Sequence, residues 1–165
     1  MSETQSGTEG RHASRLAAVQ ALYQMELAGG DAESVAEEFI QHRFLNEPEF
    51  RAGPPPDEAF FLSVLNGVPK HQVEIDRAIA ESLAENWKLN RIDSILRAIL
   101  RAAAFELIDR PDVPGKVVID EYVELAHAFF QKDEPAFVNA VLDRLARRKR
   151  AEEFGEVRPD DELRF

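Results

Sequence analysis

The chain has 165 residues, a formal net charge of −11 and no cysteine. This length predicts one domain with a substantial core and is too short for two typical domains. The absence of cysteine excludes disulfide bonds, thiolate nucleophiles and thiolate metal sites. The surplus of acidic residues excludes a uniformly basic surface for nucleic acid, because affinity for phosphate comes mainly from Lys and Arg.

No stretch of the chain has the pattern of a membrane span or an export signal. No apolar run approaches the roughly 20 residues that cross a bilayer. The N-terminal sequence MSETQSGTEG has no apolar signal-peptide segment. We therefore expect a cytoplasmic protein. The Ser, Thr, Gly and Glu content of residues 1–10 predicts a disordered N-terminal tail, and residues 151–165 read as an acidic C-terminal tail, which leaves residues 11–150 as the folded domain.

Apolar residues recur at helical spacing in seven successive segments of this domain. No segment alternates between apolar and polar residues over the length of a strand, and no internal repeat is visible. The sequence thus predicts an all-α fold, a compact bundle of about seven helices in two helical subdomains. The expected helices cover residues 10–28, 31–45, 57–69, 70–85 and 90–107, with two more within residues 111–150.

Polar residues and prolines mark the expected helix ends. The successive prolines of residues 46–56 predict a loop, and Asp57 is a favourable N-cap directly after it. Asn90 followed by Asp93 three residues later resembles a capping box. Asp133, or the glutamate after it, is expected to cap the last helix.

No sequence motif points to catalysis or to a metal site. Glu124 and His127 have the Glu-x-x-His spacing of di-iron helical bundles, and Glu9 and His12 repeat it. Such a site also needs two further inward-facing glutamates, whereas acidic and histidine side chains one turn apart are commonly a solvated helix face. The same reading applies to the acidic residues within 120–124. We expect no catalytic residue and no metal ligand.

Two features suggest nucleic-acid binding, and each has a simpler alternative. Arg11 and Arg15 share one helix face and can both reach a phosphate backbone, although surface arginines also serve solubility. Phe137 and Val138 are adjacent, so we expect one of them in the core and the other exposed. An exposed Phe137 could stack on an unpaired base. A phenylalanine in the core is the commoner outcome. The basic run of residues 144–150 is interpreted as a helix C-terminal cap.

Three separated segments resemble the NusB family of bacterial transcription antitermination factors. The C-terminal segment reads DVPGKVVIDEYVELA and then FVNAVLD, preceded by RIDSILRAILRAAAFEL and, near the N-terminus, by RHASRLAAVQALYQME. They occur in the family's order and together cover about residues 11–147. Because three correctly spaced segments agree, the resemblance is specific.

The resemblance implies an all-helical protein without cofactor. It further implies binding of boxA RNA together with NusE, a ribosomal small-subunit protein, within an antitermination complex on RNA polymerase that supports ribosomal RNA transcription. Members occur as monomers or homodimers, and the apolar faces are compatible with both. The family's RNA contacts fall on Arg11, His12, Arg15 and Phe137, with Lys116 nearby, and its partner-binding positions fall on Tyr23, Asp93 and Asp133.

The chain departs from the family pattern at several of these motifs. His12 and Ser14 interrupt an arginine-rich N-terminus, Asp120 replaces a usual Asn, and Ala140 replaces a usual Gly. Each lost cation removes a phosphate contact and about one unit of salt dependence. We therefore expect weak RNA binding by the chain alone, with a basic partner supplying charge. The alternative is a helical adaptor that binds only proteins.

Overall fold

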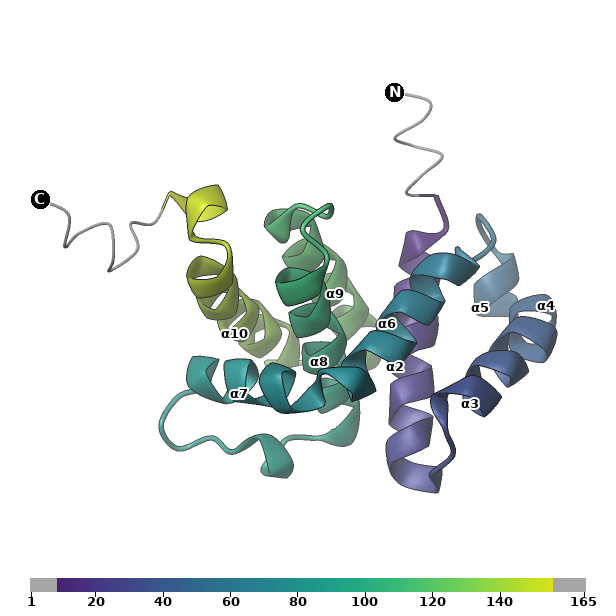
Figure 1. Ribbon diagram of the computed structural model, residues 1–165, viewed down its shortest axis with the longest axis horizontal. Coiled ribbons are helices and arrows are strands. Elements are labelled where there is room, and N and C mark those ends of the chain that lie inside the picture. The colour runs from purple at the N-terminus through teal and green to yellow at the C-terminus, as the bar shows by residue number, and fades with distance from the viewer. Residues whose placement is uncertain (1–8, 156–165) are drawn as a thin grey trace, which may run out of the picture. The chain divides into compact units, whose positions relative to one another are not determined.

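The computed structural model describes residues 9–155, and its internal contacts divide the chain into two units, Met1–His71 and Gln72–Phe165 (Figure 1). The described residues form helices and no strand, so the all-α fold with two helical subdomains is confirmed. None of the described helices is long and apolar enough to cross a membrane. Residues 1–8 and 156–165, which make up most of the tails expected at 1–10 and 151–165, lie outside the described residues.

The first unit is built on α2 (Arg11–Ala28), which packs against α6 (Glu58–Lys70). The buried face of α2 is lined by small residues, among them Ala17, Ala18 and Ala21, all of which are fully buried. Small side chains let the two helix backbones approach closely, while Phe61 and Leu65 of α6 supply the bulk of the core. The apolar spacing seen in the sequence therefore corresponds to a buried face.

The helix expected over residues 31–45 is present but is not regular throughout. It runs as α3 (Ala32–Glu38), one π-helical turn (Phe39–Arg43) and α4 (Phe44–Asn46). Phe39 and Phe44 are both buried, with ring centres 6.2 Å apart in an edge-to-face arrangement. The inserted π turn places both rings in one aromatic cluster, which a regular α-helical spacing of five residues would separate.

The loop expected over residues 46–56 contains a short helix, α5 (Pro48–Arg51), so that prediction is wrong in part. Pro48 suits a first helical turn because its missing N–H is not needed there. Phe50 then enters the aromatic cluster, with its ring centre 5.2 Å from that of Phe44. Tertiary burial of Phe50 thus overrides the local loop signal of the prolines.

A hydroxyl group ties the first turn of α2 to the start of α6. Ser14 is fully buried, and its Oγ donates to the carbonyl of Gly10 (3.0 Å) or to that of Asp57 (2.7 Å). Asp57 in turn caps α6 by accepting from the Phe60 N–H at 3.0 Å, which confirms the expected N-cap. Gly10 has φ +85°, and a Cβ there would lie 2.2 Å from the Pro55 carbonyl oxygen. Only glycine fits at this junction.

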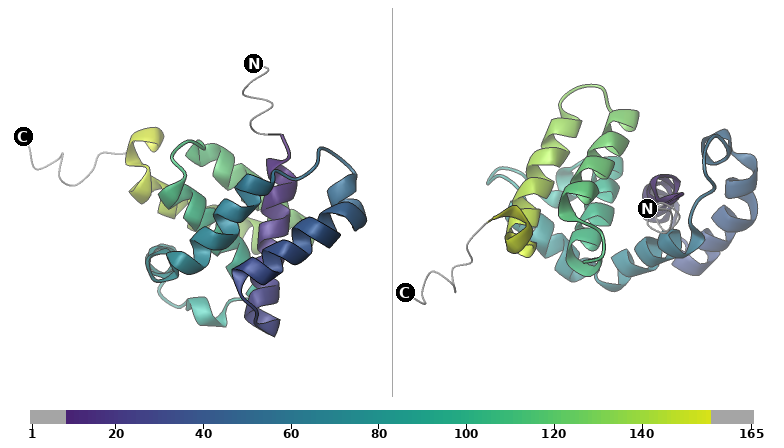
Figure 2. Two further views of the ribbon diagram at one scale, coloured as in Figure 1. Left: turned by 45° about the vertical axis from the view of Figure 1, so that its right-hand side comes forward. Right: turned by 90° about the horizontal axis from the view of Figure 1, so that it is seen from above.

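In the second unit, α8 (Ser94–Asp109) is the central helix. It contacts α7 (Gln72–Ser82), α9 (Gly115–Phe129) and α10 (Glu134–Lys149), and nearly every residue from Leu96 to Leu107 is buried. Both Figure 1 and Figure 2 show α9 and α10 side by side, as an antiparallel hairpin joined by a short turn. A 3₁₀ turn, Leu89–Arg91, lies in the connection from α7 to α8.

Two of the expected caps are different in the structure. Asp93, and not Asn90, caps α8, because Asn90 lies in the preceding 3₁₀ turn while Asp93 Oδ1 accepts from the N–H groups of Ile95 and Leu96 at 2.8 and 3.3 Å. Asp133 occupies the N-cap position of α10 but makes no side-chain capping bond. Its backbone is already helical, whereas a capping side chain normally needs an extended backbone to reach the helix N–H groups.

The basic run at the end of α10 does more than cap its own helix. Arg144 Nε donates to the Ser82 carbonyl at 2.7 Å, and Arg148 Nη2 donates to the Ala78 carbonyl at 3.0 Å, so both hold α10 against α7. Arg150 is only 8% exposed, and it contacts the C-terminal end of α8 instead of α7. Its guanidinium donates to the carbonyls of Glu106, Leu107, Arg110 and Val113 at 2.6–2.9 Å.

The first residues of the expected acidic tail differ from a solvated extension. Ala151–Phe154 form a 3₁₀ helix, and Ala151 is buried. The Phe154 ring packs against Gly115, where an added Cβ would lie 3.0 Å from the ring. The folded part of the second unit therefore continues past residue 150.

Replacing the buried guanidinium tests whether it holds the second unit together. Arg150→Met keeps most of the side-chain volume but removes the guanidinium from four carbonyls. Among the described residues, those of Glu106 and Arg110 keep a backbone N–H and those of Leu107 and Val113 do not. We expect the free energy of unfolding to fall by about 3 kcal/mol or more, because buried acceptors that lose a charged partner are costly. The measurement is urea denaturation followed by circular dichroism.

The matched control is Lys149→Met, one residue earlier and exposed. It removes the same formal charge, and we expect a change within about 0.5 kcal/mol. Equal effects of the two substitutions would contradict the assignment of Arg150 as the stabilising group.

Candidate nucleic-acid interface

Two arginines at the start of α2 lie against one aromatic ring. Because they are four residues apart, Arg11 and Arg15 point to the same side, and their Cζ atoms lie 4.6 and 4.8 Å from the centre of the Phe60 ring. Such cation–π contacts hold a guanidinium in place without neutralising its charge. The start of α2 therefore carries a preorganised pair of cations.

The two arginines differ in what they can offer a ligand. Arg11 is half-buried, and its Nε is buried without a hydrogen-bond partner among the described residues, so its terminal amino groups are the donors a ligand can reach. Arg15 is only 3% exposed. The four-residue spacing predicted that both side chains could reach a phosphate backbone. In this conformation Arg15 instead lies buried beside Phe60, where it supports the ring under Arg11.

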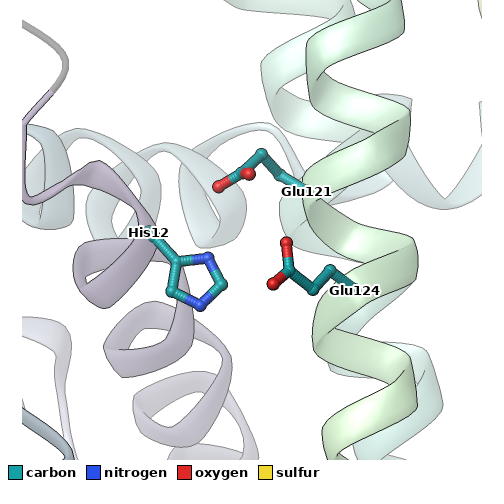
Figure 3. Close-up of side chains that lie close together, drawn as sticks. All are labelled: His12, Glu121 and Glu124. Carbon is teal, nitrogen blue, oxygen red and sulfur yellow. The ribbon is translucent and has the colours of Figure 1, made fainter. Parts of the chain in front are cut away.

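His12 and Tyr23 complete the candidate residues on α2. His12 is exposed and projects from the first turn (Figure 3). The first turn of α2 contains no acidic residue, so the positive end of the helix dipole is not offset there by a carboxylate of its own helix. Tyr23 is half-buried and lies about 16 Å further along the helix. The cationic residues and Tyr23 thus occupy separate parts of α2.

In the second unit, Phe137 is the half-buried residue and Val138 is the core residue. Val138 is fully buried, whereas the Phe137 ring packs against Trp87, with the ring centres 5.2 Å apart and the planes tilted by 44°. Trp87 is 52% exposed. In the sequence, Trp87 continues the apolar spacing of Ile79 and Leu83, and this spacing does not distinguish an exposed ring from a core residue. The pair presents aromatic surface beside the start of α10.

The remaining candidates lie at two different ends of the second unit. Lys116 is exposed in the first turn of α9, and Phe137 lies in the first turn of α10. Because the hairpin is antiparallel, the length of α9, about 20 Å, separates these two turns. Asp93 and Asp133 are both exposed, and each precedes a helix whose far end meets Arg150. They therefore lie toward the Phe137 end.

The acidic face of α9 does not resemble a buried metal site. Glu121 and Glu124 project from the same side of the helix, one turn apart (Figure 3). Glu124 and His127 are both exposed and Glu121 is half-buried, so the Glu-x-x-His pair does not point into the core of its unit. Within the second unit this arrangement fits a solvated helix face.

A carboxylate from the C-terminal 3₁₀ helix caps α9 next to Lys116. The Gly115 N–H donates to Glu153 Oε1 at 2.8 Å, and Arg150 Nη1 donates to Glu153 Oε2 at 2.9 Å. The Gly115 N–H lowers the pKa of Glu153 below its ordinary value, and the Arg150 guanidinium contributes in the same direction. The first turn of α9 is thus capped by an anion of the same chain.

Comparison with known sequences gives a consistent result. The sequence profile of the NusB family matches residues 12–147. The chain is 52% identical to the transcription antitermination protein NusB of Nitrobacter winogradskyi over 144 residues, which are 87% of this chain and 89% of that protein. It is 50% identical to the NusB of Rhodopseudomonas palustris strain BisB5 over 142 residues, which are 86% of this chain and 82% of that protein.

Solved structures agree with the sequence comparison. T. maritima NusB superposes with a TM-score of 0.72 at 31% identity, covering 88% of this chain and 96% of that one. A crystal structure of the antitermination factors NusB and NusE in complex with dsRNA contains a chain that superposes with a TM-score of 0.69, covering 84% of this chain and 96% of that one. Since that chain is only 22% identical, the likeness concerns the fold alone.

The cap on α9 predicts a pH dependence of stability. The pKa of Glu153 is depressed in the folded state, so its contribution is present above the ordinary value of 4.5 and is lost as pH falls below it. Glu153→Gln should therefore lower the midpoint of thermal unfolding at pH 7, and the difference from the unsubstituted chain should shrink toward pH 3. Glu85→Gln, at an exposed position between α7 and α8, is the charge-matched control. An equal loss at both pH values would contradict the electrostatic cap.

Proposed function

The chain belongs to the NusB family, and from this membership we propose that it binds boxA RNA together with NusE as a transcription antitermination factor. In this role it supports ribosomal RNA transcription as part of the antitermination complex on RNA polymerase. The protein acts in the cytoplasm as a binding platform, without catalysis and without a cofactor. Arg11 on Phe60 is the observation that best supports RNA binding, because it presents a fixed cation at a helix start that has no carboxylate of its own.

We assign the RNA contacts to both units. Arg11 and His12 supply cationic and hydrogen-bonding groups to phosphates, and Lys116 supplies a further charge. Phe137 offers ring surface to an unpaired base. Arg15 belongs to the same site through its contact with Phe60, as a positioning residue for Arg11.

The acidic character of the chain supports a shared site in which NusE contributes cations. A net charge of −11 opposes long-range attraction of RNA, whereas it favours a basic protein partner. We assign Tyr23, Asp93 and Asp133 to this partner. Asp93 can hold a partner's cation while it caps α8, because both capping bonds go to Oδ1 and leave Oδ2 available.

Removing the cation on Phe60 tests the RNA site. Arg11→Gln should weaken binding of labelled boxA RNA by the chain with NusE, and should reduce the slope of log affinity against log salt by about one unit. Fluorescence anisotropy at several salt concentrations measures both. Arg51→Gln, an exposed arginine of the same unit, is the control and should leave the slope unchanged. An unchanged slope for Arg11→Gln would place the phosphate contacts elsewhere.

An isosteric substitution separates the two roles of Asp93. Asp93→Asn keeps an Oδ1 acceptor for the α8 cap but removes the charge. We expect binding to NusE to weaken about 5- to 10-fold, as for a lost ion pair at an interface rim, while the unfolding midpoint stays nearly constant. Calorimetric titration and thermal unfolding measure the two quantities. If the variant lost stability and kept its affinity for NusE, Asp93 would be a cap only.

A further inference from the structure

The second unit exposes an aromatic pair that its own fold does not cover. Trp87 lies in the connection from α7 to α8 and is 52% exposed, although it has the largest aromatic side chain in the chain. One face of its ring packs on Phe137, which is half-buried at the start of α10. Its indole N–H makes no hydrogen bond to the described residues. The pair therefore exposes ring surface, and the Trp87 indole N–H is available as a donor.

The backbone that carries Trp87 is held in place by a buried cation. The Trp87 N–H donates to the Ala84 carbonyl at 2.9 Å, and Arg97, only 9% exposed, donates from Nη1 to the Ile92 carbonyl at 2.7 Å and to the Leu89 carbonyl at 3.3 Å. Trp87 is thus presented by a fixed connection between two helices. A preorganised ring loses little conformational entropy when a ligand stacks on it.

The polar groups around the pair favour a nucleobase as its ligand. The connection carries Lys88 and Arg91, both exposed, and its other exposed polar groups include the amides of Asn86 and Asn90. It is less acidic than the chain as a whole, since Glu85 is its only carboxylate between residues 84 and 91. Ring surface flanked by cations and amides is the combination that holds unpaired bases in RNA-binding proteins.

A protein ligand fits this surface less well. The apolar neighbours of Trp87 along the connection are covered, since Ile92 is buried and Leu89 is half-buried. Along the connection the exposed apolar area is therefore the Trp87 ring alone and not an extended patch, whereas protein interfaces usually bury a contiguous apolar centre. A single ring matches the size of one base.

We propose that Trp87, backed by Phe137, stacks on an unpaired nucleobase of the bound RNA and fixes the register of the strand on the second unit. This inference rests on the RNA-binding function proposed above and adds a residue and a ligand group to it. Lys88 and Arg91 contact the phosphates on either side of that base. Phe137 packs against the indole and contributes its remaining exposed surface to the same base.

Trp87 is the only tryptophan of the chain, so one label reports on this site alone. The chain labelled with 5-fluorotryptophan gives a single ¹⁹F resonance, which is followed on addition of NusE alone, of single-stranded boxA RNA alone, and of both. A parallel anisotropy titration with labelled RNA measures total affinity. A set of RNAs with one abasic position each then locates the stacked base.

The inference predicts that RNA shifts the ¹⁹F resonance and that one abasic position abolishes the shift. Trp87→Leu should weaken RNA binding about 10-fold or more, whereas Trp87→Phe, which keeps an aromatic face, should stay within about 3-fold of the unsubstituted chain. Far-ultraviolet circular dichroism checks that both variants are folded. The ¹⁹F result needs no substitution and so does not depend on them.

The contrary outcomes separate this inference from the proposed function. RNA binding by anisotropy with an unchanged ¹⁹F resonance would overturn the stacking site and leave the proposed function intact. A shift caused by NusE alone, with none added by RNA, would place Trp87 in a protein interface and overturn the inference. Absence of RNA binding by the unsubstituted chain with NusE, seen by anisotropy, would overturn both.

Discussion

The second unit depends on one buried guanidinium. At the end of α8 the Glu106 carbonyl accepts from the Arg110 N–H, and the carbonyls after it have no further helical turn to supply donors. Arg150 supplies donors to four carbonyls at this point and places a positive charge at the negative end of the helix dipole. Because Arg150 directly follows α10, this contact also fixes where the α9–α10 hairpin meets α8. Lys116 at one end of the hairpin and Phe137 at the other take their positions from it.

In the first unit, structural and functional roles fall on the same few residues. Phe60 is a core residue of α6, yet its ring face holds two guanidiniums, one of which remains accessible. Ser14 interrupts the basic run at the start of α2, and its hydroxyl fastens that helix to α6. Ser14 thus has a structural role at the start of α2.

The sequence predicted the helices well because their apolar spacing is local information. It predicted Asp57 as a cap for the same reason, since a cap acts within one turn. It failed where a residue is fixed by contacts distant along the chain. Phe50 draws a proline-rich segment into a helix, and Trp87 meets Phe137 only after the whole second unit has folded. The carbonyl partners of Arg150 could not be predicted from apolar spacing either. The sequence showed a basic run at residues 144–150 but not that its last arginine contacts the end of another helix.

The place of Arg150 along the chain has a consequence for protein synthesis. All contacts described within the first unit join residues up to His71, so this unit can form while later residues are still being translated. The second unit has no such option, because the group that caps its central helix is encoded at the end of its last helix. Until that codon has been read and the residue has left the ribosome, the end of α8 lacks the guanidinium donors to the Glu106 and Leu107 carbonyls. A chain that ends before residue 150 therefore lacks the cation that faces the negative end of the α8 dipole.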